Sequence, residues 1–346
     1  MNPMDAQLDQ VAGILRGSRR IWVTTHIKSD GDGIGCELAL YRALASTGKD
    51  VRVVNDTMVP RALRFLMDRD DEIARYDPFR DNPYLKTADT IVVLDVGLSY
   101  RLGRLESEFL ASRAVKICLD HHLDRDGVFT HSLADSQATS TGEILYPLLK
   151  RMGAPITERV STPLFASISV DSGNFAYERC TPQTFRIAAD LIEAGASPYQ
   201  IHLGLNWQRH FEEVKLDGDV IQRLRVDPSG QIAHSEVTSE MLQRLQIDPM
   251  EMPTVVNIPL SLDGVEIALL FVEMEPCYIK VSARSKGRVR VSDLARQFGG
   301  GGHPLAAGFS LRGSLDEARA KVLAAARGLL GVSSRPCEAE ASGAAG

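Results

Sequence analysis

The first group of side chains able to bind a cation lies within seven residues of the sequence: His26, Asp30 and Asp32. Imidazole and carboxylate groups are ligands for divalent metals, and the neighbouring glycines let the backbone turn tightly around them. A polar turn that caps the next helix accounts for this segment about equally well when it is considered alone. A calcium-binding EF-hand loop does not, because Ile34 stands in place of a third oxygen ligand and Tyr41 in place of the closing glutamate.

Three further groups of the same kind occur later in the sequence. Asp95 and Asp171 each follow a short apolar run, as do the consecutive residues Asp120, His121 and His122. A single aspartate at such a position is more often a helix cap or a turn residue than a metal ligand, and one of two adjacent histidines can be structural. However, ligands bind at the carboxyl ends of the strands in open α/β sheets, and four coincidences at that edge are hard to explain otherwise. We therefore predict a shared metal site.

The types of the predicted ligands indicate the ions. Four carboxylates and two histidines are too many ligands for one ion, so we expect two divalent ions. Oxygen and nitrogen ligands without thiolates favour Mn²⁺, Mg²⁺ or Co²⁺ over a structural zinc. Mn²⁺ is the expected ion, and Mg²⁺ and Co²⁺ are the alternatives.

A parallel sheet would bring these groups to one edge, and the first half of the sequence predicts such a sheet. Short apolar runs alternate with helical patterns, which is typical of βαβ units. Nearly continuous apolar runs predict strands that are covered on both faces. The predicted strands are Arg20 to Thr25, Val51 to Asn55, Thr90 to Asp95 and Ala114 to Asp120, and a helix is expected from Ile34 to Thr47. The predicted fold class is therefore α/β, with a doubly wound, mainly parallel sheet.

The second half of the sequence predicts a second, smaller α+β domain. A helix is expected from Phe185 to Ala194, and a polar segment follows it. The later strands are expected at Gln231 to Val237, Val255 to Leu260, Glu266 to Glu273 and Tyr278 to Arg284, before a helix at Val291 to Phe298. We predict a catalytic domain over residues 1–190, a linker over 191–215, a second domain over 216–332 and a disordered tail over 333–346.

Composition and charge exclude several classes of protein. The 346 residues are 44% hydrophobic and 24% charged, which is ordinary for a globular protein of two domains. No apolar stretch approaches the roughly 20 residues that a membrane-spanning helix needs, and the N-terminus does not resemble a secretory signal. We therefore expect a cytoplasmic protein that does not bind a membrane. The net charge of -6 argues against binding of long duplex nucleic acid.

The four groups resemble the four motifs of the DHH phosphoesterase superfamily in their order along the chain: His26-x-x-x-Asp30-x-Asp32, then Asp95, then Asp120-His121-His122, then Asp171. A later segment, Gly299 to Phe309, is similar to the substrate-binding signature of the first type of DHH-associated C-terminal domain, and Lys280 to Ser285 precede it. The resemblance covers about residues 15 to 330 and is greatest with the nanoRNase branch of the superfamily.

This resemblance implies an activity and a role for each residue. The implied activity is hydrolysis of very short oligoribonucleotides (nanoRNA) and of 3'-phosphoadenosine 5'-phosphate (PAP), so the implied partner is short single-stranded RNA or a nucleotide. The implied metal ligands are His26 and Asp30 for one ion, Asp32, His121 and Asp171 for the other, and Asp95 between the two. Asp120 is implied to orient a ligand histidine, and His122 to contact the phosphate or protonate the leaving oxygen. Ser29 and Cys36 depart from the family pattern at positions that carry no ligand.

The second domain contains a candidate substrate site. Strand alternation predicts that Lys280, Ser282 and Arg284 share one face, and Arg284 is able to bind a phosphate in bidentate fashion. Consecutive glycines allow backbone N–H groups to approach a phosphate closely, whereas a flexible linker would lack the helix before them and the histidine after them. The predicted substrate-binding residues are Lys280, Ser282, Arg284, Gly300, Gly301, Gly302 and His303.

Two other functions stay open at this point. Linear or cyclic dinucleotides such as pApA, pGpG and cyclic di-AMP would suit the same site as nanoRNA and PAP. A catalytically inactive nucleotide sensor would use the fold only for binding, although all six implied metal ligands are present. The sequence does not determine the oligomeric state, and a homodimer is one of the alternatives.

Overall fold

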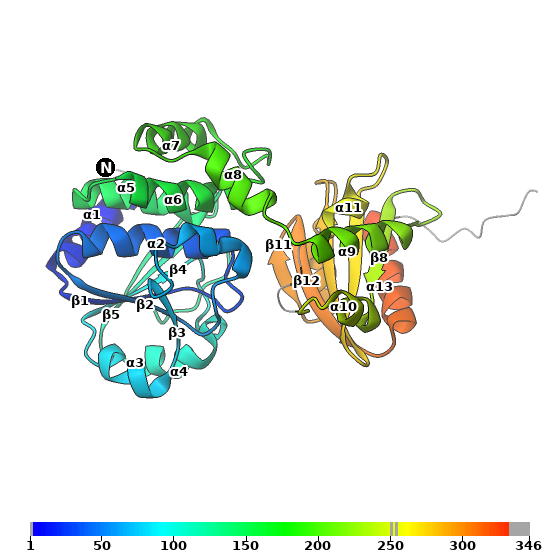
Figure 1. Cartoon of the computed structure of the whole chain (residues 1–346), viewed down its shortest axis with the longest axis horizontal. Helices are drawn as coiled ribbons and strands as arrows, with labels where there is room; N and C mark the ends of the chain where they lie inside the picture. Colours follow the sequence, from blue (N-terminus) through cyan, green and yellow to red (C-terminus); the bar gives the residue numbers. More distant parts are fainter. Residues whose placement is uncertain (1–2, 250–251, 253–254, 332–346) are drawn as a thin grey trace, which may run out of the picture. The chain divides into compact units, whose positions relative to one another are not determined.

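The computed structural model describes residues 3–249, 252 and 255–331 and divides into two compact units, whose boundary in the sequence lies between Gln208 and Arg209 (Figure 1). This boundary falls inside the segment 191–215, for which the sequence predicts a linker. That segment contains helix α8 (Pro198–Asn206) and the first residues of helix α9 (Phe211–Gln222). The predicted tail over 333–346 lies outside the described residues.

The first unit contains a six-stranded, fully parallel sheet with the strand order β3-β2-β1-β4-β5-β6. The strands are β1 (Arg20–Thr24), β2 (Asp50–Asn55), β3 (Ile73–Arg75), β4 (Thr90–Leu94), β5 (Val115–Asp120) and β6 (His131–Ala134). The sequence predicts four of these strands within a residue or two of their observed ends. The predicted α/β fold with a parallel sheet is therefore confirmed.

Alternate side chains of β1, β2 and β4 enter two separate hydrophobic cores. Ile21 and Val23 of β1 belong to one core, whereas Trp22 between them belongs to the other. Successive side chains of a strand point to opposite faces of a sheet, so both faces of this sheet are covered. The helices that contribute to the first core are α1 (Pro3–Gly17), α2 (Gly31–Ala45), α5 (Thr141–Met152), α6 (Glu158–Asp171) and α7 (Pro182–Glu193), with α8 and the 3₁₀-helix η1 (Arg61–Leu66). The second face is covered by α3 (Pro78–Leu85), η2 (Ser99–Leu105) and α4 (Glu106–Ala111) (Figure 1).

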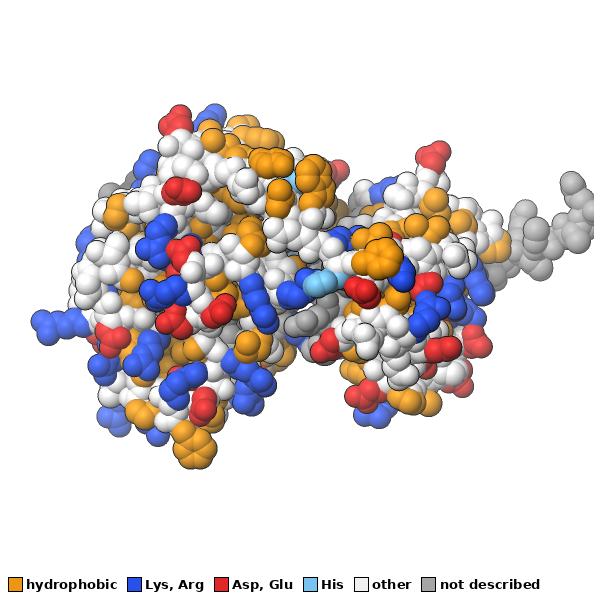
Figure 2. Space-filling view, viewed as in Figure 1, with side chains coloured by type: hydrophobic (Ala, Val, Ile, Leu, Met, Phe, Trp, Pro, Cys, Tyr) orange, Lys and Arg blue, Asp and Glu red, His pale blue; other side chains and the backbone are white. Residues whose placement is uncertain are grey.

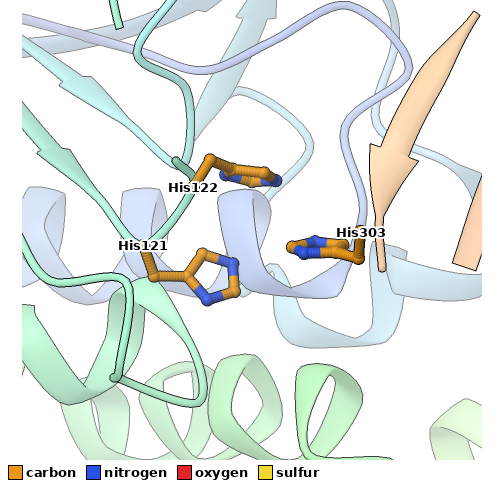
Figure 3. A group of neighbouring side chains, drawn as sticks. All are labelled: His121, His122 and His303. Carbon is orange, nitrogen blue, oxygen red and sulfur yellow. The ribbon is translucent and has the colours of Figure 1, made fainter. Parts of the chain in front are cut away.

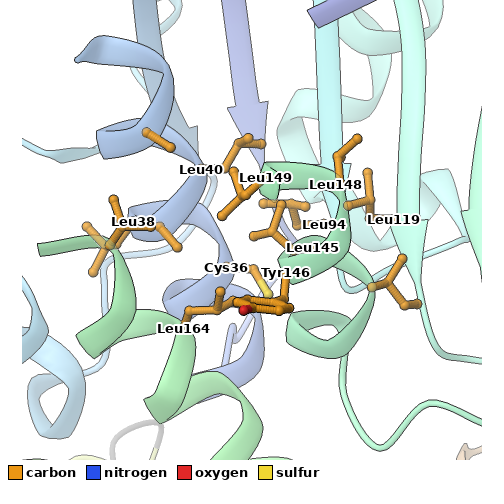
Figure 4. Packing of buried hydrophobic residues seen from close by; sticks show 14 of the residues in the cluster. Cys36, Leu38, Leu40, Leu94, Leu119, Leu145, Tyr146, Leu148, Leu149 and Leu164 are labelled. Atoms are coloured by element: carbon orange, nitrogen blue, oxygen red, sulfur yellow. The ribbon is translucent and has the colours of Figure 1, made fainter. Parts of the chain in front are cut away.

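Leucine is the most frequent residue of the first core. Figure 4 shows Leu40 of α2 beside Leu149 of α5, together with Leu94 and Leu119 near the ends of β4 and β5. Leu94 and Leu119 each precede an acidic residue that the sequence predicts to be functional. The same packing that buries this core therefore also fixes the carboxyl ends of the central strands.

Helices α2 and α6 approach each other closely because α2 has glycines at the contact. A Cβ atom at Gly35 would lie 2.4 Å from the carbonyl oxygen of Pro163 and 2.9 Å from the Cβ of Ser167. A Cβ atom at Gly31 would lie 2.5 Å from a methyl carbon of Val170. Side chains cannot occupy such positions without movement of one helix. The two glycines therefore bring the beginning of α2 next to the end of α6.

The second unit contains a mixed sheet with the order β11-β12-β10-β9-β8-β7, in which only β8 and β9 are parallel neighbours. The strands are β7 (Arg225–Val226), β8 (Ile232–Val237), β9 (Ile267–Glu275), β10 (Tyr278–Ser285), β11 (Gly301–His303) and β12 (Ala306–Arg312). The helices are α9, α10 (Ser239–Leu245), α11 (Asn257–Leu260), α12 (Val291–Gln297) and α13 (Leu315–Leu330). Two hydrophobic cores again cover its two faces. No helix among the described residues has both the length and the apolar character required to cross a membrane.

Two local predictions are wrong. The segment Val255 to Leu260, predicted as a strand, ends in the short helix α11, because Pro259 has no N–H for a sheet ladder and fits the first turn of a helix. Asp171 is the last residue of helix α6 and does not follow a strand. The apolar run before Asp171 continues a helical pattern of buried residues at Val160, Leu164 and Ile168, and short apolar runs do not distinguish a helix from a strand.

The close approach of α2 and α6 predicts the effect of adding one methyl group. Gly35→Ala should lower the free energy of unfolding by about 1–3 kcal/mol, the usual effect of overpacking a core. Gly13→Ala in α1 is the matched control, because a Cβ atom there meets nothing within 4 Å. That control should stabilise the protein by roughly 0.5–1 kcal/mol. Urea denaturation compares the two variants, and equal stability would mean that Gly35 does not limit the helix contact.

Candidate metal centre

The predicted metal ligands come from the ends of three adjacent strands and from two helices. His26 follows β1, Asp95 follows β4 and His121 follows β5, and these strands are neighbours in the order β1-β4-β5. Asp30 is the N-cap of α2 and accepts hydrogen bonds from the backbone N–H groups of Asp32 (3.1 Å) and Gly33 (3.4 Å). Because parallel strands end at the same edge, all of these groups face one region.

The structure brings the six predicted ligands together in two groups of three. His26, Asp30 and Asp95 form one group, and Asp32, His121 and Asp171 form the other. Within each group the candidate ligand atoms lie within 4.8 Å of one another.

Asp95 lies between the two groups. One of its carboxylate oxygens is 3.3 Å from Nε2 of His26, and the other is 3.5 Å from Nε2 of His121. His121 Nε2 is in turn 3.1 Å from Oδ2 of Asp171. One carboxylate that reaches both groups is the arrangement expected of a ligand shared by two ions.

The two adjacent histidines have different surroundings (Figure 3). Their rings meet edge to face, with centroids 4.8 Å apart, yet the side chain of His121 is 1% exposed and that of His122 is 24% exposed. Nδ1 of His122 lies 2.7 Å from Oδ1 of Asp120, which also accepts the backbone N–H of His122 at 3.1 Å. The sequence predicts that Asp120 orients a ligand histidine. In the structure Asp120 instead contacts His122, for which a catalytic role is predicted.

The carboxylates of this region are buried so closely together that they repel one another. Asp95 is 1% exposed, and burial together with the nearby charges of Asp32 and Asp30 raises its pKa well above the usual range. Burial raises the pKa of Asp171 to about 7, although its hydrogen bond with His121 acts in the opposite direction. Buried carboxylates at such distances are not all ionised unless a positive charge compensates them.

The same negative charges favour the protonated, positively charged form of His121. Burial lowers the pKa of His121, but the hydrogen bond with Asp171 and the charges of Asp32 and Asp171 outweigh that effect and raise it to about 9. The cluster therefore favours positive charge at the position of His121 Nε2. Divalent cations would supply such charge, and carboxylate and imidazole donors without thiolates suit Mn²⁺ or Mg²⁺. The residues present thus fit a metal centre.

Residues that the sequence analysis missed hold Asp32 in place. Its carboxylate accepts the backbone N–H groups of Thr141 (2.7 Å) and Gly142 (3.3 Å) at the beginning of α5, and it also accepts the hydroxyl of Ser167 in α6. Thr141 Oγ1 donates to Asp95 at 3.1 Å and so links the two aspartates. The signal for this contact is Ser140-Thr141-Gly142 directly before a helical apolar pattern, which is typical of a helix N-terminus.

Backbone strain is concentrated around the same residues. Six described residues other than glycine have positive φ angles, and one of them is Asp95 itself, with φ 62°. Lys28 lies between His26 and Asp30, while Asn174 and Phe175 follow Asp171 within four residues. Strained backbone of this kind persists where the surrounding structure enforces it, and it clusters at functional sites.

The predicted substrate residues of the second unit lie on one sheet. Lys280, Ser282 and Arg284 of β10 are partly exposed, whereas the residues between them are buried, as the alternation predicts. Arg284 is paired with Ala306 of β12, and Ala306 is paired with His303 of β11. Directly opposed residues of antiparallel strands share a face, so Arg284 and His303 lie on the same face of the sheet.

Gly300, directly before β11, and Gly302 within it have a structural role that the sequence analysis did not recognise. A Cβ atom at Gly300 would lie 2.3 Å from the carbonyl oxygen of Gly308, and one at Gly302 would lie 2.5 Å from that of Ala306. Both positions therefore require glycine for close packing on β12. Gly301 is exposed and has open space around its Cα. Packing therefore explains why residues 300 and 302 are glycines, but it does not explain the glycine at position 301.

Comparison with known proteins identifies both units. The N-terminal domain of the DHH family matches residues 20–168, and the DHHA1 domain matches residues 230–330. The Thermus thermophilus protein named bifunctional oligoribonuclease and PAP phosphatase NrnA is 30% identical over 308 residues, which cover 89% of each chain. Among solved structures, an exopolyphosphatase-related protein from Bacteroides fragilis is 27% identical with a TM-score of 0.87, covering 92% of this chain and 95% of that one. RecJ from Thermus thermophilus in complex with Mn²⁺ shares the fold, with 16% identity, a TM-score of 0.56 and coverage of 93% and 55%.

The repulsion among the carboxylates predicts the behaviour of Asp95→Asn. Asparagine keeps the shape of the side chain and tolerates a positive φ, but it cannot ionise, so it removes the free-energy cost of holding this carboxyl among the others. The metal-free variant should be more stable than the metal-free wild type by on the order of 1–3 kcal/mol, as for relief of one buried uncompensated group. Thermal unfolding in a chelator measures this gain, and added Mn²⁺ should stabilise the variant far less than the wild type.

Asp70→Asn is the control for this substitution, because Asp70 is an exposed aspartate of the same unit. It should change neither the metal-free stability nor the response to Mn²⁺. A metal-free Asp95→Asn protein that is less stable than the wild type would contradict the electrostatic account.

Proposed function

The chain belongs to the DHH family, and from this premise we propose that it is a metal-dependent phosphoesterase that hydrolyses nanoRNA to mononucleotides and PAP to AMP and phosphate. The observation that carries the proposal is the pair of ligand groups joined by Asp95. The name of the Thermus thermophilus relative, which is similar over most of both chains, supports these two substrates in particular.

The metal ligands are proposed from the geometry of the first unit. His26, Asp30 and Asp95 would hold one divalent ion, and Asp32, His121 and Asp171 would hold the second, with Asp95 in contact with both. We infer Mn²⁺ from the oxygen and nitrogen donors, with support from the RecJ structure in complex with Mn²⁺, and Mg²⁺ or Co²⁺ would suit the same donors. When bound, two such ions provide positive charge for phosphoryl oxygens and acidify water.

His122 is proposed to transfer a proton to the leaving oxygen. Nδ1–H of His122 donates a hydrogen bond to Asp120, which fixes the plane of the ring, so that Nε2 lies on the side away from Asp120. Burial raises the pKa of Asp120, but the hydrogen bonds from His122 outweigh burial and lower it, so this carboxyl is ionised beside the ring. A fixed imidazole next to an ionised carboxylate is a common general acid.

The distribution of charge supports a short substrate. The net charge is -6, and on the visible face of the first unit acidic and basic side chains are interspersed (Figure 2). Long nucleic acids are held mainly by neutralisation of many phosphates, which requires an extended basic surface. A short oligonucleotide or a nucleotide needs only a few local contacts, which Lys280, Ser282, Arg284, Gly301 and His303 are proposed to provide.

A turnover assay with a panel of substrates tests the proposed function. Metal-free protein supplied with Mn²⁺ should hydrolyse PAP and RNA of two to five nucleotides, and a chelator should abolish both activities. Rates on pApA, pGpG and cyclic di-AMP, measured under the same conditions, compare the alternative dinucleotide substrates with PAP and short RNA. Hydrolysis of dinucleotides without hydrolysis of PAP or of RNA of three to five nucleotides would contradict the proposed substrates. Binding of nucleotides without turnover would identify a sensor.

The role of the second unit predicts a specific effect of Arg284→Ala. Loss of a charged hydrogen bond to the part of the substrate that does not react costs about 1.5–3 kcal/mol and acts equally on the ground and transition states. The KM for PAP and short RNA should therefore rise roughly tenfold or more, with little change in kcat. Steady-state kinetics measure both constants.

Two controls accompany this variant. Bis-p-nitrophenyl phosphate lacks the distal nucleotide, so its hydrolysis should be nearly unchanged in Arg284→Ala. Arg296→Ala removes an exposed arginine of α12 and should leave both substrates unaffected. Equal losses on the nucleotide and on the artificial substrate would mean that Arg284 supports the fold and does not bind the substrate.

A further inference from the structure

Glu37 is a buried carboxyl that belongs to neither group of proposed metal ligands. It lies in α2, and its exposed fraction is 0%. Its Oε2 accepts a hydrogen bond of 2.8 Å from Nδ2 of Asn55. Burial raises the pKa of Glu37 to about 8, against a smaller opposing effect of the Asn55 hydrogen bond, so the group carries its proton at neutral pH. An aliphatic side chain at this position would avoid the free-energy cost of desolvating a carboxyl. The presence of the carboxyl therefore points to a role for its hydrogen bond.

Asn55 connects Glu37 to the end of strand β1. Asn55 is the last residue of β2, and its Oδ1 accepts the backbone N–H of Thr25 at 3.3 Å and the hydroxyl of Thr24 at 3.2 Å. The amide of Asn55 is thus oriented on both sides, with its oxygen toward β1 and its nitrogen toward Glu37. Without an acceptor at position 37, the Nδ2 group would lose this partner inside the core, where the loss of a hydrogen bond is most costly.

Thr25 extends the same chain of hydrogen bonds to strand β4. Its hydroxyl donates to the carbonyl oxygen of Leu94 at 2.8 Å. Thr25 directly precedes His26, and Leu94 directly precedes Asp95. The side chains that form this chain are buried and shielded from water, which strengthens each hydrogen bond. A continuous path therefore leads from Glu37 to the backbone that carries His26 and Asp95.

We propose that Glu37 is a positioning residue for the metal centre, which through Asn55 and Thr25 fixes the backbone of His26 and Asp95 and so sets the metal affinity of the His26, Asp30 and Asp95 group. This inference rests on the proposed metal-dependent function. It distinguishes the two groups, because Asp32 of the other group is held by Thr141, Gly142 and Ser167. Loss of Glu37 should therefore weaken one ion more than the other.

Titration of the metal-free full-length protein with Mn²⁺, followed by electron paramagnetic resonance, tests the proposal. Glu37→Gln keeps the shape and an acceptor for Asn55, so both Mn²⁺ affinities should stay close to those of the wild type. Glu37→Leu should lower one of the two affinities by about 10- to 100-fold, the usual effect of removing a group that orients metal ligands. Asn55→Ala should produce the same loss, and it replaces Glu37→Leu if that variant does not fold.

Two further variants identify which ion is affected. In a His26→Ala background, Glu37→Leu should cause a smaller additional loss of Mn²⁺ affinity than it causes in the wild type, because both substitutions act on the group of His26, Asp30 and Asp95. Ser167→Ala is the matched substitution for the other group, and its effect should add to that of Glu37→Leu.

The outcomes separate this inference from the proposed function. Wild-type protein that binds no Mn²⁺ would overturn the metal centre itself. Two ions bound by the wild type and equally by Glu37→Leu would overturn only the positioning role of Glu37. Equal losses in Glu37→Gln and Glu37→Leu would also overturn it, because the glutamine retains the hydrogen bond on which the argument depends.

Discussion

Repulsion between buried carboxylates is the constraint on which the rest of the first unit depends. Asp95 is almost completely buried, and the charges of Asp30, Asp32 and Asp171 surround it. Such an arrangement opposes folding unless cations compensate it or some of the groups stay protonated. The surrounding structure fixes these carboxylates: Asp95 has a positive φ, and Asp32 accepts hydrogen bonds from two helices. An arrangement that lowers stability in this way is common at functional sites, and it supports the proposed cation site.

The fold explains how residues far apart in the sequence reach this site. Parallel strands end at one edge of the sheet, so loops after β1, β4 and β5 are neighbours without any special contact between them. The contribution of Asp171 is different, since it depends on the packing of α6 against α2. Gly31 and Gly35 permit that packing, and Ser167 of α6 then reaches Asp32. The carboxyl edge of the sheet and the close contact between α2 and α6 therefore both contribute side chains to the cluster of proposed metal ligands.

The strand-end residues could be predicted from the sequence because hydrophobic runs followed by polar residues define the ends of buried parallel strands. Residues that act through backbone or shape were not found in this way. Thr141 and Gly142 hold Asp32 through their backbone N–H groups, and the residues Ser140-Thr141-Gly142 predict only the start of a helix, not this contact. The sequence does predict Asp171 as a ligand, but at the end of a strand, whereas it is the last residue of helix α6, whose apolar run resembles a strand. The contact between Asp120 and His122 is local in sequence, yet the direction of a side chain after a strand depends on the loop that follows it.

The most direct test of a two-ion centre is anomalous diffraction from crystals of the protein grown with Mn²⁺. The account predicts two manganese peaks in each chain, one bounded by His26, Asp30 and Asp95 and the other by Asp32, His121 and Asp171, with Asp95 in contact with both. A single peak, or peaks away from these residues, would contradict it.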